Sequence, residues 1–267
     1  MSSAKYLAVS LGMLCFVSSS LIIAFGQTSY SKEALVSEKD GTVHVVANDS
    51  RPLLQTIDAL QIKYGWRINY EDPQYASKLD VVDAKGLQDK ATYPNGEHRV
   101  PGGGTFTADF PVKTAPIASV EERKILQSII ESYNRSNNPG RFELREDSSG
   151  EIFDLVGVSA HDNQGKVSAQ QVLLDQSLTI AAQERTFSDT MDLMCDSLTE
   201  KTHVKVSLGV HPMGLDRTKV TVGGKDLAAR AYLSRAIEST NRKLEWRLLY
   251  DPDSSGYFLN VHQVKLP

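Results

Sequence analysis

The sequence predicts an α+β protein with two tandem small modules, each a strand–helix–strand unit followed by a helix and a hairpin. Helices are expected to pack on small mixed sheets. Two observations support this prediction: stretches with helical spacing of apolar residues alternate with stretches of strand-like alternation, and the same order of elements occurs twice along the chain. The first module is assigned to residues 43–160, a linker to 161–176, and the second module to 177–265.

The first helix is predicted over residues 52–64. Its apolar residues lie at 53, 54, 57, 60 and 64, Ser50 is a plausible N-cap, and Pro52 suits the first turn. Gly65 then ends the helix. The alternation of Trp66, Ile68 and Tyr70 with polar residues predicts a half-buried strand directly afterwards, so that one face of that strand contributes to the core.

A helix and a hairpin complete the first module. The motif that begins at Ser119 is a capping box, and it opens a helix predicted over residues 119–134. The hairpin follows, with strands at 142–144 and 152–158 and a turn at Asp147-Ser148-Ser149-Gly150.

The second module repeats this order with a diverged sequence. Its predicted elements are a strand at 178–180, a helix at 186–199, a strand at 204–208, a helix at 227–240, and a hairpin of 244–250 and 257–264. The second hairpin also turns at Asp-Ser-Ser-Gly, which is the clearest identity between the copies. The first copy differs by a long insert at 72–118, rich in proline and glycine, and loops of this length are commonly functional.

The N-terminal residues 1–26 are typical of a secretory signal peptide. A short segment with Lys5 precedes an apolar stretch, and Ala24-Phe25-Gly26 supplies small residues for cleavage before Gln27. The alternative is an uncleaved membrane anchor, since the apolar stretch approaches the length needed to cross a bilayer. We expect an exported protein, periplasmic or secreted, with no membrane span after cleavage.

Composition excludes several classes of partner and cofactor. The net charge of −4 and the absence of a basic stripe argue against nucleic-acid binding. Cys195 is the only cysteine outside the signal segment, so no disulfide is expected within the mature chain. Its position on an apolar helix face indicates a core thiol rather than a nucleophile.

The run from Arg51-Pro52-Leu53-Leu54 to Tyr64-Gly65-Trp66-Arg67-Ile68-Asn69-Tyr70 resembles the short N-terminal domain of secretins and TonB-dependent receptors (the STN domain). The stretch Thr186–Leu208 is similar, but it lacks the glycine between helix and strand. The resemblance implies a bacterial envelope protein with two diverged STN-like copies and a protein-contacting, non-enzymatic fold. The insert departs from the family's compact domain.

No motif indicates a catalytic, cofactor or metal site. The six histidines lack zinc-binding spacing, and surface or hydrogen-bonded histidines explain them. Asp251-x-Asp253-x-Ser255-Gly256 looks like the front half of a calcium loop, but the twelfth position is His262 rather than glutamate, so a hairpin turn is the favoured interpretation.

We therefore expect a non-enzymatic protein-binding or envelope-assembly module whose partner is a protein or peptide. Trp66 and Tyr70 are assigned to the core, while Tyr75 and Tyr93 are expected as exposed contacts. Phe106 and Phe110 lie on a strand whose edge is expected to accept an extended peptide. The alternative is a secreted hydrolase with a site assembled around the 72–118 insert.

Overall fold

The computed structural model describes residues 33–84, 98–112, 119–147 and 150–264. The predicted signal segment 1–26 and Tyr93 lie outside these residues. Within them, helices and strands alternate in small sheets, which confirms the α+β fold class. Among the helices of the described chain, none is both long and apolar enough to cross a membrane.

The elements of the first half include the predicted helices, strands and hairpin in the expected order, with the unpredicted strands β1, β4 and β5 in addition. They are β1 (Leu35–Lys39), β2 (Thr42–Asn48), α1 (Pro52–Tyr64), β3 (Arg67–Glu71), β4 (Val81–Asp83), β5 (Arg99–Pro101), β6 (Thr105–Pro111), α2 (Ser119–Arg135), β7 (Arg141–Glu146) and β8 (Ile152–His161).

The second half repeats the order of strands and helices from β2 to β8, but it has no counterparts of β4 and β5, and it contains two short 3-10 helices in addition. Its elements are β9 (Val167–Ala169), η1 (Leu173–Asp175), β10 (Ser177–Thr186), α3 (Phe187–Thr202), β11 (Val206–Leu208), η2 (Leu215–Arg217), β12 (Lys219–Ala228), α4 (Ala229–Glu238), β13 (Leu244–Asp251) and β14 (Gly256–Gln263).

Helix α1 has the bounds that its apolar spacing predicts. Pro52 occupies the first turn, and Gly65 ends the helix in the left-handed region at φ 69°, where a side chain is strained. The N-cap is Arg51 rather than Ser50, which corrects the prediction. Asp49 accepts the Arg51 N–H at 2.8 Å, so this aspartate, not the serine, fixes the turn before the helix.

Strand pairing is the same in the two halves. The antiparallel pair β2–β6 corresponds to β10–β12, and the parallel pair β3–β8 corresponds to β11–β14. The hairpin β7–β8 corresponds to β13–β14. Each half therefore consists of two helices between a sheet containing an antiparallel strand pair and a three-stranded mixed unit.

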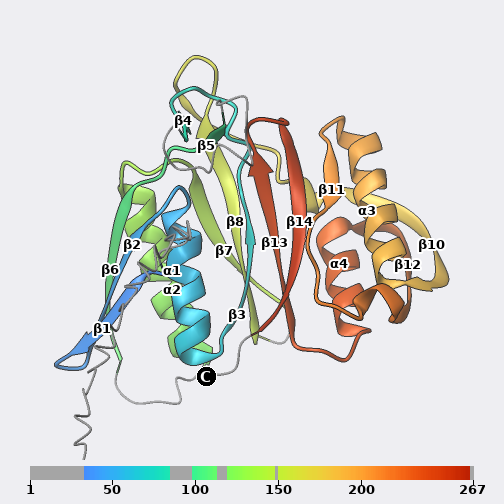
Figure 1. Cartoon of the computed structure of the whole chain (residues 1–267), viewed down its shortest axis with the longest axis horizontal. Coiled ribbons are helices and arrows are strands. Elements are labelled where there is room, and N and C mark those ends of the chain that lie inside the picture. The colour runs from blue at the N-terminus through green and yellow to red at the C-terminus, as the bar shows by residue number, and fades with distance from the viewer. Residues whose placement is uncertain (1–32, 85–97, 113–118, 148–149, 265–267) are drawn as a thin grey trace, which may run out of the picture. The chain divides into compact units, whose positions relative to one another are not determined.

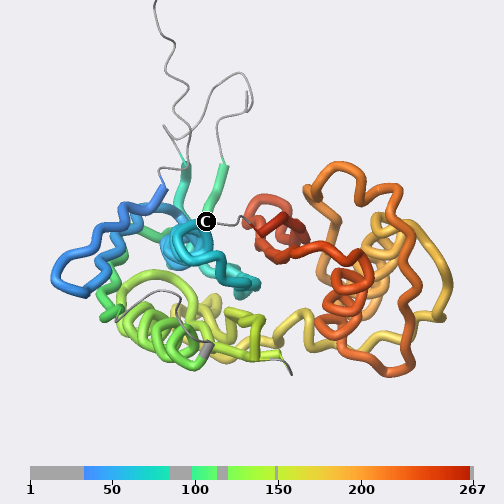
Figure 2. Tube along the Cα trace, turned by 90° about the horizontal axis from the view of Figure 1, so that it is seen from below, coloured from blue at the N-terminus to red at the C-terminus, as the bar shows by residue number. Residues whose placement is uncertain are grey.

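The two halves share one central sheet, with strand order β11-β14-β13-β3-β8-β7 and β9 beside β8. The halves meet where β13 pairs with β3 in parallel (Figure 1). Helices α1 and α2 cover one face of this sheet, and α3 and α4 cover the other (Figures 1 and 2). Each pair of helices encloses its own apolar core.

The structure shows how the two connections are built. The segment 161–176, predicted as a linker, contains β9, which pairs with β8, and the short helix η1, whose Leu173 and Leu174 are buried in the second core. The insert is shorter than 72–118. Strand β6 pairs with β2 along its whole length, as β12 pairs with β10, so it belongs to the repeated fold. The residues peculiar to the first half lie between β3 and β6.

Candidate functional site

The seam between the halves is built on strand β3, whose residues are buried from Ile68 to Glu71. Ile68 and Tyr70 face the first core, as their alternation predicts. The prediction of a half-buried strand implied that Asn69 faces solvent, but the second half covers both Asn69 and Glu71. Asn69 accepts the Trp246 N–H at 2.9 Å and donates to Asp154 at 2.8 Å.

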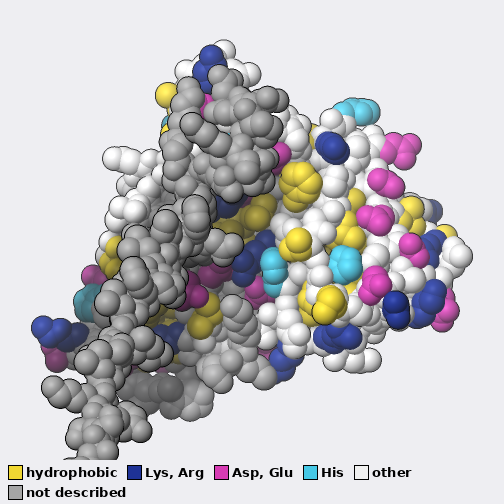
Figure 3. All heavy atoms as spheres, in the orientation of Figure 1, with side chains coloured by type: hydrophobic (Ala, Val, Ile, Leu, Met, Phe, Trp, Pro, Cys, Tyr) yellow, Lys and Arg dark blue, Asp and Glu magenta, His cyan; other side chains and the backbone are white. Residues whose placement is uncertain are grey.

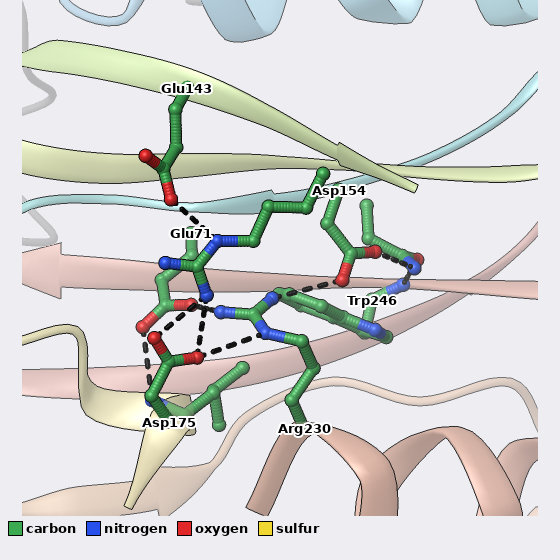
Figure 4. Close-up of polar contacts among 9 residues, drawn as sticks. Glu71, Glu143, Asp154, Asp175, Arg230 and Trp246 are labelled. Carbon is green, nitrogen blue, oxygen red and sulfur yellow. Dashed lines mark hydrogen bonds and ion pairs between the residues drawn. The ribbon is translucent and has the colours of Figure 1, made fainter. Parts of the chain in front are cut away.

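Arg230 of α4 reaches across this seam into a group of carboxylates (Figure 4). Its guanidinium pairs with Glu71, with Asp154 at 3.0 Å and with Asp175 at 3.4 Å, and it lies 5.4 Å from the centre of the Trp246 ring. One residue of the second half thus contacts β3, β8 and the connecting segment. We call this group of residues the Arg230 clasp.

The clasp buries the Glu71 carboxylate away from water, which disfavours its charged form. Burial raises the pKa of Glu71, while the Arg230 guanidinium and the Leu174 N–H at 3.1 Å act in the opposite direction. Arg145 extends the group by pairing with Asp175 at 2.6 Å and with Glu143 at 2.6 Å. These charges bond to one another, so the clasp is a structural fastening of the two halves.

A second set of contacts fastens the opposite face of the seam. Arg247 of β13 pairs with Asp58 of α1 at 2.7 Å and with Glu245 at 2.7 Å. Near the end of β3, Arg51 pairs with Asp72 at 2.7 Å, and Asp72 accepts the Tyr250 N–H at 3.0 Å. The seam is therefore held by short parallel pairing and by buried charge pairs on both sides.

The aromatic residues expected at a partner surface lie in the core instead. Tyr75 is only 3% exposed and packs against Tyr250, so its assignment as an exposed contact is wrong. Phe106 and Phe110 are also buried, because they occupy the inward face of β6 over the first core. Trp66 and Tyr70 are buried, as predicted.

The described part of the insert is attached to the second half. The Arg99 N–H donates to Asp253 at 3.0 Å, the Arg99 guanidinium donates to the Pro252 carbonyl at 2.7 Å, and His98 pairs with Asp253. The hairpin of β4 and β5 thus spans from the first half to the β13–β14 turn. This contact favours a bracing role for these residues over a free binding arm.

His161 and Asp80 form the arrangement closest to a catalytic pair. Asp80 is fully buried and bonds both the backbone N–H and Nδ1 of His161, at 2.8 and 2.6 Å. A buried carboxylate that orients an imidazole is half of a general-base site, which also needs a nucleophile or water beside Nε2. The hydrogen bonds of the His161 ring and backbone N–H go to Asp80. The pair therefore attaches the insert, which contains Asp80, to strand β8.

The remaining candidate chemistry has structural explanations. Asp251 accepts the N–H groups of Asp253 and Ser254, which supports the interpretation of that segment as a hairpin turn. Cys195 is buried in the second core, and burial raises the pKa of its thiol to about 12. Among the described residues, no group of histidine, cysteine, aspartate or glutamate side chains has the geometry to hold a metal ion.

Strand β6 offers an open edge. It pairs with β2 on one side, and no other strand of the described chain pairs with its opposite side. The Thr105 carbonyl faces away from β2, toward Asn138 at 3.4 Å, while the Val112 N–H donates to Gly41 on the paired side. Backbone direction alternates along an antiparallel strand, so the groups of Thr107 and Asp109 also face away from β2.

Sequence reasoning missed the seam because its central residues have partners far away in the chain: Asn69 bonds Trp246, 177 positions later, and Glu71 bonds Arg230, 159 positions later. One signal in the sequence was available. The run Ile130-Glu131-Ser132-Tyr133-Asn134-Arg135 recurs as Ile237-Glu238-Ser239-Thr240-Asn241-Arg242, which aligns α2 with α4 and places Arg123 at the position of Arg230.

Comparison with known proteins adds no further assignment: no protein-family model, curated protein or solved structure matches this chain.

Proposed function

We propose that this chain is an exported, non-enzymatic module of the cell envelope that binds an extended segment of a partner protein by strand addition at β6. The observation that carries the proposal is the open edge of β6. Thr107 and Asp109 direct backbone N–H and carbonyl groups away from β2, and an extended peptide satisfies such groups by pairing with them.

The form of the strand supports this use. Its outward side chains, Thr105, Thr107 and Asp109, are exposed and small enough to let a peptide approach the backbone. Its inward side chains anchor the strand in the first core, so that the edge is presented on a fixed support. Asn138 bonds the Gly104 N–H at 2.9 Å and the Thr105 carbonyl, and thereby marks where the open stretch begins.

The resemblance of residues 51–70 to the STN domain supports a protein partner and an envelope location, and the charged and apolar segment 1–26 supports export. N-terminal sequencing of the protein from its native cell tests export. A start at Gln27 is expected, and a start at Met1 or Ser2 contradicts it.

Substitution at the edge tests the binding mode. Peptides selected by display against the full chain should protect the Thr107 and Asp109 amides from hydrogen exchange. Thr107→Pro removes one outward N–H and should weaken peptide binding about tenfold, the effect of losing roughly one hydrogen bond.

Thr107→Ala is the matched control, because it shortens the same side chain and keeps the N–H. It should bind within about twofold of the parent chain. Circular dichroism checks that both variants fold. Binding that leaves the β6 amides unprotected, or that survives Thr107→Pro unchanged, contradicts the proposal.

A further inference from the structure

The seam joins a strand edge of the second half to a different strand edge of the first half. Because the two halves are repeats, the chain has a second strand edge of each kind. The seam pairs β13, the hairpin edge of the second half, with β3, the opposite edge of the first half. By the repeat, β7 corresponds to β13 and β11 corresponds to β3. Strands β7 and β11 are the two ends of the central sheet, and in the described chain neither pairs with a further strand.

We propose that copies of this chain associate head to tail, with the β7 edge of one copy beside the β11 edge of the next, in the arrangement of the internal seam. An interface between two different surfaces of the same chain extends into an open row unless the rotation between copies closes it into a ring.

Charge placement supports this pairing. In the seam, Arg247 reaches Asp58 on the outer side of α1 and also bonds Glu245. The β7 residue that corresponds to Arg247 is Arg145, which bonds Glu143 at 2.6 Å as Arg247 bonds Glu245, and which also pairs with Asp175 of its own chain at 2.6 Å. Glu143-Leu144-Arg145 thus repeats the pattern of Glu245-Trp246-Arg247.

The residue that corresponds to Asp58 is Asp196. Helices α1 and α3 align through their left-handed C-caps, Gly65 and His203, and this alignment also superimposes their buried positions. Asp196 is exposed and has no ion-pair partner among the described residues. A neighbouring copy therefore places Arg145 opposite Asp196, as Arg247 lies opposite Asp58.

The surface around Asp196 combines acidic side chains that are unpaired within the described chain with exposed apolar ones, as expected where a second copy binds. Acidic side chains gather over α3 (Figure 3), where Asp189 and Asp192 lie with Asp196 along one side of the helix. Beside the β11 edge, three apolar side chains are exposed: Val210 at 60%, Met213 at 95% and Phe258 at 38%. Exposed apolar groups next to an open edge favour association with another strand.

The interface between copies is weaker than the seam because it lacks a counterpart of the Arg230 clasp. The positions of Asn69, Glu71 and Asp72 are occupied after β11 by Gly209, His211 and Pro212. Arg123, which corresponds to Arg230, meets no carboxylate there. The seam also forms within one chain, which gives it a high effective concentration. Association between copies is therefore reversible and depends on protein concentration.

Sedimentation of the full chain, expressed with its own N-terminal segment, tests the proposal over about 1 µM to 1 mM. The mean mass should rise with concentration and fall with added salt. Asp196→Arg should weaken association about tenfold or more, because it opposes Arg145 of the next copy. Glu238→Arg, at an exposed position at the end of α4, should leave association unchanged. A parent chain that stays monomeric throughout, or equal effects of both substitutions, overturns the proposal.

A cross-linking experiment distinguishes this geometry from other self-association and does not depend on a charge reversal. Arg145→Cys and Asp196→Cys are made in separate chains and treated with a short bis-maleimide. Linked dimers should form in the mixture and not with either variant alone. The parent chain is the control for its own two cysteines, Cys15 of the predicted signal segment and Cys195, whose buried thiol should not react. Dimers that form equally in a single variant, or no dimers in the mixture, overturn the assignment of β7 and α3.

Discussion

Strands β3 and β11 occupy the same position in the repeat, yet one lies at the centre of the sheet and the other at its end. Strand β3 is paired on both sides, and the polar side chains of Asn69 and Glu71 are buried with partners from the other half. Strand β11 is paired on one side, and exposed residues follow it. The comparison shows that polar side chains on the second face of β3 distinguish it from β11. These side chains are buried because the second half supplies their hydrogen-bond and ion-pair partners.

The largest expected difference between equivalent positions concerns Arg230 and Arg123. Arg230→Ala leaves the buried Glu71 and the partly buried Asp154 without their cation, which should cost about 3–5 kcal/mol of unfolding free energy. Arg123→Ala removes an exposed pair with Glu146 and should cost less than about 1 kcal/mol. Urea denaturation of both variants measures the difference. Equal losses would show that the clasp does not fasten the halves.

The second prediction concerns the insert, which only the first half possesses. Asp253→Ala removes the acceptor for the Arg99 N–H, a partly exposed contact, and should cost about 1 kcal/mol. Hydrogen exchange should accelerate at Arg99 and at the β4–β5 pairs, while the seam amide of Trp246 stays protected. Glu200→Ala on the exposed side of α3 serves as control. Unchanged exchange at Arg99 contradicts the bracing role of the insert.

The third comparison is between Glu122 and the equivalent Ala229. Burial raises the pKa of Glu122 to about 8, and its Oε1 has no hydrogen-bond partner among the described residues. A raised carboxyl pKa means that stability is present at low pH and is lost as pH rises toward the folded pKa. The change in melting temperature caused by Glu122→Ala should therefore be more favourable at pH 8 than at pH 4, as measured by thermal unfolding. A gain that does not change with pH contradicts this assignment.

Local elements were predictable from the sequence because their signals are local. The apolar spacing gave the bounds of α1, and the Asp-Ser-Ser-Gly turns located both hairpins. Burial of Tyr75 was not predictable in this way, because it depends on Tyr250 of the other half. Strand β6 was assigned to the insert because its partner, β2, lies on the far side of α1 and the insert in sequence.

The seam also sets the order in which this chain can fold. The Asn69 side chain cannot form its bond with Trp246 until 177 more residues have been synthesised, and Glu71 cannot pair with Arg230 until 159 more have. Contacts of such long sequence separation slow folding, since the intervening chain must be closed into a loop first. During synthesis the first half therefore emerges with the open edge of β3 unpaired, and that edge is prone to wrong pairing until the last hairpin arrives. Mistakes in folding should accordingly concentrate at β3, and late truncations of the chain should aggregate rather than yield a stable first half.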